Sequence, residues 1–255
     1  MKDDAEMLAM LDAARGRARA PISGFAVGAV ARGRSGELYL GANLEFAGAA
    51  LGATVHAEQA AVANAWAHGE RGITELAVTD APCGHCRQFL NELRDAGSLR
   101  ILLPGREPLT LRELLPEDFG PADLRSSARL LDLADHLLRL EHPAAGDPLA
   151  SAALAAARAS HAPYTGAFAG VALALADGST RVGSSAENAA FNPGLPALQA
   201  ALVQLALNRE PYAEIRRAVL VETSGSSSQR AATETLLAAV APGIALTWLG
   251  ALRDS

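Results

Sequence analysis

The chain has 255 residues, half of them hydrophobic and only 4% aromatic, and its formal net charge is −6. A chain of this kind has enough apolar residues for the core of one large domain or two moderate ones, but it lacks the basic tracts and stacking side chains that bind nucleic acids. No apolar run approaches the length of a membrane span, and the acidic N-terminus does not have the order of a signal peptide. We therefore expect a cytoplasmic protein that acts on a small molecule, with neither nucleic acid nor a membrane as its partner.

Residues 1–125 carry a regular alternation of helix and strand patterns. An expected strand pair flanks the turn Gly33–Gly36, and alanine-rich apolar faces mark the helices that follow. The expected elements, in chain order, are a helix at 5–19, a loop at 21–24, strands at 27–32 and 37–41, a helix at 56–68, a strand at 76–79, a helix at 83–95 and a strand at 99–103.

Residues 148–255 repeat this order after a connector at 126–147, in which 130–141 leads into a loop at 143–148. The segment Ala162–Gly166 echoes Ala20–Gly24, and self-similarity at a spacing of roughly 140 residues indicates two related domains rather than a solenoid. The sequence therefore predicts an α/β fold with two tandem domains, each a mixed β-sheet covered by helices. The expected elements of this half are strands at 170–176 and 180–183, a helix at 196–208, a strand at 218–222, a helix from about 228 to 240 and a strand at 244–249.

The segment His56–Glu58 is followed, after one expected helix and one strand, by the Pro-Cys-x-x-Cys pattern of Pro82–Cys86. The order H-x-E…P-C-x-x-C is the signature of zinc-dependent nucleobase deaminases. One imidazole and two thiolates fill three positions of a tetrahedral zinc and leave the fourth for water, as a catalytic zinc requires. We therefore predict that His56, Cys83 and Cys86 bind Zn²⁺ and that Glu58 is the catalytic proton carrier.

Helix geometry and the second half both support this assignment. Cys83 and Cys86, three residues apart at an expected helix start, share one face, where free backbone N–H groups and the helix dipole favour thiolates. The second half has lost the whole set together, so we expect one zinc per chain. Its counterparts of His56, Glu58 and the two cysteines are Pro196, Leu198, Ser224 and Ser227.

Two other interpretations of the cysteines remain open on the motif alone. Cys-Gly-His-Cys is also a disulfide-exchange sequence, although Pro82 precedes it and that interpretation leaves His56 and Glu58 without a role. A structural zinc would need a fourth ligand, for which His85 is available but awkwardly placed between two ligands. A His85 side chain in solvent or beside the ligands is the better expectation.

Longer stretches of the sequence resemble the cytidine deaminases, specifically the dimeric bacterial type with one active and one degenerate domain in each chain. The resemblance covers nearly the whole chain. The stretches that carry it are Phe25–Ala29, Asn43–Phe46, Val55–Gln59, Pro82–Gln88, Leu103–Glu107 and Glu187–Pro193.

This resemblance implies a zinc-dependent deaminase domain at 1–125, a connector at 126–147 and a degenerate domain without zinc ligands at 148–255. It also implies hydrolysis of cytidine and deoxycytidine to uridine and deoxyuridine plus ammonia, in pyrimidine nucleoside salvage. Asn43 and Glu45 would bind the ribose hydroxyls and Phe25 would pack on the base; without the resemblance, Asn43 would be taken as a turn residue and Glu45 as a surface charge. The implied partner is a second copy of the chain, in a homodimer in which the degenerate domain completes the partner's site. The implied substrate-binding residues are Phe25, Asn43, Leu44, Glu45, Ala57, Phe119, Ala190 and Phe191.

Overall fold

The structure is a computed structural model, and it describes residues 2–142, 144, 146–225 and 227–253. The chain divides into two compact units, each containing one five-stranded sheet. Unit 1 comprises Met1–Glu45, Thr54–Asp132 and Asn188–Gly194, and unit 2 comprises Phe46–Ala53, Leu133–Glu187 and Leu195–Ser255. Each unit thus contains a short segment from the other half of the sequence.

Unit 1 is built on a mixed sheet with the strand order β2-β1-β3-β4-β5. The β1 strand pairs antiparallel with β2 and with β3, β3 pairs parallel with β4, and β4 pairs antiparallel with β5. In chain order its elements are α1 (Lys2–Ala9), α2 (Leu11–Arg15), β1 (Gly28–Gly33), β2 (Leu38–Ala42), α3 (Ala57–Ala67), β3 (Ile73–Val78), α4 (Gly84–Leu90), β4 (Arg100–Leu102), β5 (Leu109–Thr110) and α5 (Leu111–Leu114), with a 3-10 turn at Ala96–Ser98.

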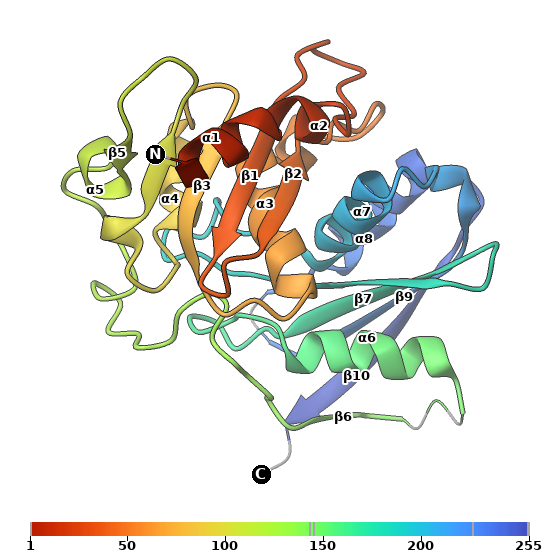
Figure 1. Ribbon diagram of the computed structural model, residues 1–255. Coiled ribbons are helices and arrows are strands. Elements are labelled where there is room, and N and C mark those ends of the chain that lie inside the picture. The colour runs from red at the N-terminus through yellow and green to blue at the C-terminus, as the bar shows by residue number, and fades with distance from the viewer. Residues whose placement is uncertain (1, 143, 145, 226, 254–255) are drawn as a thin grey trace. The chain divides into compact units, whose positions relative to one another are not determined.

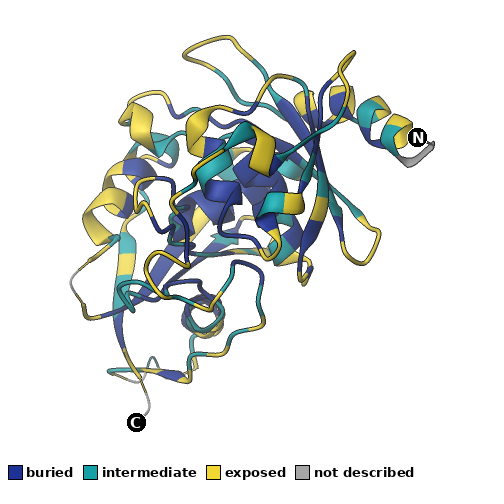
Figure 2. Ribbon diagram, turned by 90° about the vertical axis from the view of Figure 1, so that its left-hand side faces the viewer, coloured by how far each residue is buried: buried dark blue, intermediate teal, exposed yellow. Residues whose placement is uncertain are grey.

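Helices cover this sheet on both faces, and most of α3 is buried (Figures 1 and 2). Met7, Leu11 and Ala14 of α1 and α2 pack against apolar residues of β1, β3 and β4. The α3 helix lies so close to β2 that a Cβ atom on Gly41 would meet the Ala57 carbonyl oxygen at 2.2 Å. Only glycine fits this position, so Gly41 sets the distance between β2 and the start of α3.

Unit 2 repeats the arrangement with the strand order β6-β10-β9-β7-β8. Again one pair, β9 with β10, is parallel and the other pairs are antiparallel. Gly183 of β8 occupies the place of Gly41, because its Cβ would lie 2.3 Å from the Ala197 carbonyl oxygen. The elements are β6 (Leu138–Leu140), α6 (Pro148–Arg158), β7 (Ala169–Leu175), β8 (Thr180–Ser184), α7 (Ala197–Leu207), β9 (Ile215–Thr223), α8 (Arg230–Val240) and β10 (Leu246–Arg253), with 3-10 turns at Leu51–Ala53 and Tyr212–Glu214.

The predicted α/β class, with two mixed sheets covered by helices, is confirmed, and several details differ from the expectations. The helix expected at 5–19 is two helices and ends at Arg15, because Arg19 pairs with Leu44 in an isolated bridge. The helix expected at 83–95 ends at Leu90, because Leu93 pairs with Leu130 in a similar bridge. In addition, the connector supplies β6, and β5, α5 and α6 were not expected.

Residues 143 and 145 of the loop expected at 143–148 lie outside the described residues. Among the residues that are described, no helix combines the length and the apolar character needed to cross a membrane.

Candidate metal centre

The centre is formed where two helices of unit 1 begin. His56 is the N-cap of α3, and its extended backbone (φ −84°, ψ 156°) turns the chain into the helix. The side chain of Gln59, three residues on, accepts a hydrogen bond from the His56 backbone N–H at 3.2 Å. This contact is half of a capping box, and it fixes the backbone of His56 to the first turn of α3.

Cys83 is the N-cap of α4, and Cys86 lies in its first turn. Cys86 is buried and Cys83 is exposed. The Arg87 side chain donates hydrogen bonds to the carbonyl oxygens of Pro82 and Leu114, both at 2.8 Å, and so holds the start of α4 against the end of α5. Because its guanidinium is hydrogen-bonded to these two carbonyl oxygens, the Arg87 side chain stabilises the turn that carries the two cysteines.

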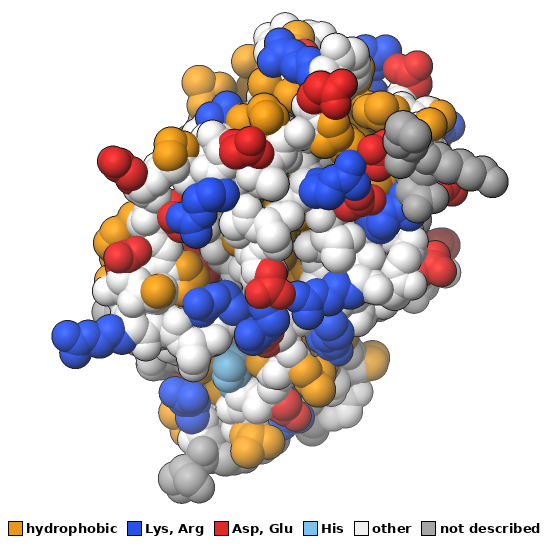
Figure 3. Space-filling view, turned by 60° about the vertical axis from the view of Figure 1, so that its left-hand side comes forward, with side chains coloured by type: hydrophobic (Ala, Val, Ile, Leu, Met, Phe, Trp, Pro, Cys, Tyr) orange, Lys and Arg blue, Asp and Glu red, His pale blue; other side chains and the backbone are white. Residues whose placement is uncertain are grey.

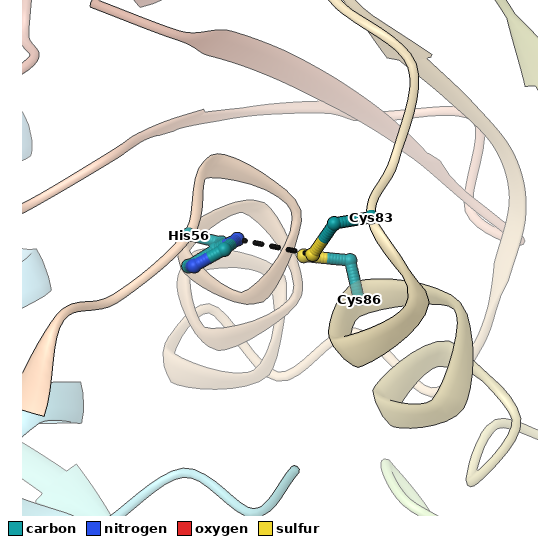
Figure 4. Close-up of side chains that lie close together, drawn as sticks. All are labelled: His56, Cys83 and Cys86. Carbon is teal, nitrogen blue, oxygen red and sulfur yellow. Dashed lines mark hydrogen bonds between the residues drawn. The ribbon is translucent and has the colours of Figure 1, made fainter. Parts of the chain in front are cut away.

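The structure brings His56, Cys83 and Cys86 together, as Figure 4 shows. Their candidate ligand atoms all lie within 4.8 Å of one another, and Cys83 Sγ is 3.5 Å from His56 Nδ1. In a tetrahedral zinc site with bonds of about 2.3 Å to sulfur and about 2.0 Å to nitrogen, these two atoms would be about 3.5 Å apart. The three side chains therefore fit a zinc ion. Among the described residues, no other cluster of three His, Cys, Asp or Glu side chains has this spacing.

The two thiols differ in acidity because they share a hydrogen bond. The bond from Cys86 lowers the pKa of Cys83 to about 4, with help from backbone N–H groups of the helix start and from His56. The same bond and burial raise the pKa of Cys86. Cys83 is therefore a thiolate at neutral pH, which is the form that binds a metal.

Glu58 lies in the first turn of α3 and is only 4% exposed. Burial raises the pKa of its carboxyl group, although hydrogen bonds and the nearby His56 oppose that effect. A buried carboxyl beside two metal-binding groups, with its pKa moved toward neutrality, is suited to accept and return protons.

His85 stacks on His56, with ring centroids 5.5 Å apart and an interplanar angle of 28°. Burial, and then the neighbouring His56, lower the pKa of His85, so its ring is neutral at pH 7. This position beside the ligand imidazole, outside the cluster of three, agrees with the expectation for His85.

The side chain of Asn43 is tied to the strand entry that follows Phe25. Its Nδ2 donates to the Phe25 carbonyl oxygen at 2.9 Å, and its Oδ1 accepts from the Val27 N–H at 2.8 Å. A primary amide has two N–H donors and two acceptor lone pairs. Asn43 therefore keeps one donor and one lone pair for a ligand.

Glu45 anchors the loop that precedes Phe25. Its carboxylate accepts hydrogen bonds from the backbone N–H groups of Ile22 and Ser23, at 2.8 and 2.9 Å, and from the Ser23 hydroxyl. Partial burial raises the pKa of Glu45, but these three hydrogen bonds outweigh it and leave a lowered value. Glu187 makes the same three bonds to Tyr164 and Thr165 in unit 2.

The remaining expected site residues fall into two groups. Leu44 and Ala57 are fully buried, at 0% exposure. The other four, Phe25, Phe119, Ala190 and Phe191, are exposed at the surface of unit 1. The exposed fractions of the three phenylalanines are 57%, 48% and 63%, in that order.

Three polar side chains with hydrogen bonds on or directly after α3 and α4 were not singled out from the sequence, namely Gln59, Gln88 and Glu92. For Gln59 a signal was present, because Gln three residues after an N-cap is the second half of a capping box. For Gln88 and Glu92 no signal was present, because their partners lie about a hundred residues away in the sequence.

Two regions of the chain match family models with the same description, "Cytidine and deoxycytidylate deaminase zinc-binding region": residues 1–99 and residues 111–234. With the fit of the three side chains, these matches confirm the expected zinc cofactor. The second match includes Pro196 and Leu198, where the first has His56 and Glu58.

The chain is also similar to full-length relatives of known name. It is 51% identical to cytidine deaminase of Serratia proteamaculans over 94% of this chain and 81% of that protein. It is 48% identical to cytidine deaminase of Vibrio atlanticus over 98% of this chain and 84% of that protein. A crystal structure of cytidine deaminase from Mycobacterium tuberculosis aligns with 46% of this chain and 96% of that chain, with 34% identity and a TM-score of 0.42.

Proposed function

The chain belongs to the cytidine deaminase family, and from this membership we propose that it hydrolyses cytidine and deoxycytidine to uridine and deoxyuridine plus ammonia. The observation that carries the proposal is the buried Glu58 beside the cluster of His56, Cys83 and Cys86. A proton carrier next to a three-ligand metal set is the minimum equipment for hydrolytic deamination.

His56, Cys83 and Cys86 would hold the zinc, which, when bound, supplies a water molecule of lowered pKa. Glu58 would take a proton from that water and pass it to N3 of the base, and would then take the second proton from the oxygen that has bonded to C4 and deliver it to the amine, which leaves as ammonia. Its raised pKa suits this work, because the carboxyl group must gain and lose a proton at the same pH. Burial thus serves the reaction directly.

The ribose would be bound by the hydrogen-bonding capacity of Asn43 and Glu45 that their internal hydrogen bonds do not use. One N–H of Asn43 and one lone pair of Glu45 remain after their internal hydrogen bonds are counted. Both side chains are held in fixed positions, so a nucleoside hydroxyl would meet prearranged partners, and a free base would leave them unpaired. Phe25 and Phe119, which are both about half exposed, would pack against the base, and Leu44 and Ala57 would line the site.

A spectrophotometric assay tests the proposal. Purified protein should convert cytidine to uridine, with loss of the cytosine absorbance, and should act far more slowly on free cytosine. Glu58→Gln should remove the activity and retain zinc. Insulin reduction measured alongside tests the disulfide-exchange alternative, and metal content without turnover would indicate a structural zinc. Either of these outcomes without cytidine turnover contradicts the proposal.

We further propose that the protein is a cytoplasmic homodimer in which Ala190 and Phe191 contribute to the partner's active site. The support is the 63% exposure of Phe191, a large apolar side chain that a second copy would cover. The domains would be a catalytic one at 1–125, a connector at 126–147 and a degenerate one at 148–255. Nucleic acid is not a partner on this proposal: arginines are neutralised in pairs such as Arg32–Glu75 and Arg94–Asp132, and basic and acidic side chains are intermingled on the face in Figure 3.

Subunit mixing tests the dimer. Glu58→Ala and Phe191→Ala chains, each inactive or weak alone, should regain activity on mixing, because one site of the heterodimer has both an intact Glu58 and an intact partner Phe191. Absence of recovery despite demonstrated subunit exchange, or full activity of a monomer, contradicts the proposal.

A further inference from the structure

The segment Asn188–Gly194 comes from the second half of the sequence but is part of unit 1. The exchange is reciprocal, because Phe46–Ala53, which follows Glu45 as Asn188 follows Glu187, is part of unit 2. In unit 2 the ring of Phe46 packs near the ring of Tyr212, with the ring centroids 6.1 Å apart. The catalytic unit therefore contains seven residues that its own half of the sequence does not supply.

In unit 1 this segment is held by hydrogen bonds to Gln88 of α4 and to Glu92, which lies two residues after the end of α4. Asn188 Nδ2 donates to the Gln88 carbonyl oxygen at 2.8 Å, and Gln88 Nε2 donates back to Asn188 Oδ1 at 3.2 Å. The backbone N–H of Ala189 donates to Glu92 Oε1 at 2.7 Å. Asn188 and Glu92 are both completely buried. Buried hydrogen bonds to an amide and a carboxylate are directional, so they fix α4 in position where apolar packing alone would allow it to slide.

The other end of the segment meets α3. Gln59 Nε2 lies 3.4 Å from the Gly194 carbonyl oxygen and 3.5 Å from that of Pro193. Oε1 of the same side chain accepts from the backbone N–H of His56. One short segment thus contacts both helices whose starts carry the three zinc ligands.

We propose that Asn188 and Glu92 are positioning residues for the zinc site, acting through α4 on Cys83 and Cys86. The α4 helix has only seven residues, and a helix so short is not stable in isolation, so its place is set by what it packs against. Loss of either residue lets the cysteine-bearing turn move relative to His56 and weakens the hold on the metal. The inference rests on the proposed function only for its kinetic part.

The experiment compares zinc release in Glu92→Ala, Asn188→Ala and Glu92→Gln. Zinc-loaded protein is mixed with excess 4-(2-pyridylazo)resorcinol well below the unfolding temperature, and the metal transfer rate is followed by colour. We expect release about tenfold faster in both alanine variants, which is the size of effect seen when groups that support metal ligands are removed. Glu92→Gln keeps an acceptor for the Ala189 N–H and should release zinc near the wild-type rate.

Two control variants separate positioning from general loss of stability. Asn192→Ala changes an exposed side chain of the same segment, and Ser160→Ala removes a fully buried hydroxyl of unit 2 that donates to the Ala157 carbonyl oxygen. Both should release zinc at the wild-type rate, even where Ser160→Ala lowers the melting temperature. If the alanine variants at 92 and 188 fail to fold, Gln88→Ala replaces them in the test. This change at a half-buried side chain removes the hydrogen bond from Gln88 to Asn188, and it should speed zinc release by a smaller factor.

The proposal is overturned if folded Glu92→Ala and Asn188→Ala release zinc at the wild-type rate, or if Ser160→Ala accelerates release as much as they do. On cytidine, both alanine variants should also show a lowered kcat, but zinc release and not KM is the deciding measurement, because Ala190 and Phe191 of the same segment are among the proposed site residues. A protein that does not deaminate cytidine would refute the proposed function while leaving the zinc-release comparison fully interpretable.

Discussion

Units 1 and 2 both bring two helix starts close together, but the side chains at those helix starts differ. In unit 1 the starts of α3 and α4 carry His56, Cys83 and Cys86. In unit 2 the N-cap of α8 is Gln229, whose Oε1 accepts from the Ala197 N–H at the start of α7 at 2.9 Å. In unit 2 a side-chain amide therefore links the two helix starts, whereas in unit 1 the corresponding helix starts carry the metal ligands.

A buried carboxylate completes the network in unit 2. Glu222 accepts hydrogen bonds from the Ser228 hydroxyl at 2.6 Å, the Gln229 N–H at 2.8 Å and the Trp248 indole N–H at 2.8 Å. Leu198, fully buried, takes the place of Glu58. The comparison teaches that this fold can join two helix starts through side-chain hydrogen bonds alone, so the ligand set of unit 1 is not a requirement of the fold.

The largest effect is expected from removing a ligand of unit 1. Cys83→Ser or His56→Ala should lose the zinc and reduce turnover to background. Ser227→Ala should change neither, because the described residues of unit 2 contain no cluster of metal-binding side chains. Metal analysis should find one zinc per wild-type chain. Two zincs per chain, or turnover that survives chelation of all metal, would break the comparison.

Glu58→Gln comes next and should keep the metal while removing the proton carrier. We expect turnover to fall by at least about 10²–10⁴-fold, the usual contribution of a general acid–base group. Because the glutamine amide is uncharged and has nearly the same shape as the buried carboxyl group that it replaces, the variant should be about as stable as wild type. Thermal unfolding and steady-state kinetics on one preparation test both statements, and turnover within tenfold of wild type would refute the role of Glu58.

Glu222→Ala tests the network of unit 2. Three donors lose their acceptor at a buried position, and we expect the free energy of unfolding to fall by about 2–4 kcal/mol. Glu222→Gln keeps an acceptor and should cost about 1 kcal/mol. Chemical denaturation measures both, and zinc content should stay at one per chain. Equal stability of Glu222→Ala and wild type would show that the network does not hold unit 2 together.

Glu45 and Glu187 form a matched pair, because each anchors a loop through the same three hydrogen bonds. Glu45→Gln and Glu187→Gln should lower stability by similar small amounts, about 1 kcal/mol each. Only Glu45→Gln should raise the KM for cytidine, by about tenfold, because only unit 1 would bind a ribose. An equal rise in both variants would assign Glu45 to the loop alone.

The smallest effect concerns acid. The lowered pKa of Glu45 means that its folded form binds the proton less readily than the unfolded chain does. Its contribution to stability is therefore present above the ordinary carboxyl pKa of about 4.3 and is lost as pH falls through the lowered folded value. Denaturation curves of wild type and Glu45→Gln should converge as the pH is lowered below that range. A difference that stays constant into strong acid would contradict the assignment.

The signals that predicted the fold and the site were local ones. Two of the expected zinc ligands are helix N-caps and the third lies in the first turn of α4. The close helix–strand approaches are at Gly41 and Gly183, which occupy matching places in the two copies. The missed helix α6 was readable too. Asp147 caps it by accepting from the Leu149 N–H, and Pro148 occupies its first turn, an N-terminal signature that the expected loop at 143–148 concealed.

The local sequence patterns did not reveal the hydrogen-bond partners of buried polar side chains, because these partners are distant in the sequence. Glu92 sits in a segment expected to be helical, and an exposed carboxylate would be its default environment. Its burial depends on Ala189, a residue 97 positions later. Similarly, Glu45 was expected to bind only substrate, because the three donors that it accepts from are 22 and 23 residues away and are not distinguished by sequence.

The hydrogen bonds between Asn188 and Gln88 have a consequence for how the protein is made. All three zinc ligands have left the ribosome once residue 86 has emerged, but Asn188, which bonds to the cysteine-bearing helix α4, follows about a hundred positions later. At a synthesis rate of roughly 5–20 residues per second, the nascent chain exposes its cysteines for roughly 5–20 s before the unit is complete. During that interval the thiols are open to oxidation and to the wrong metal, so a newly made catalytic centre matures only after most of the chain has been translated.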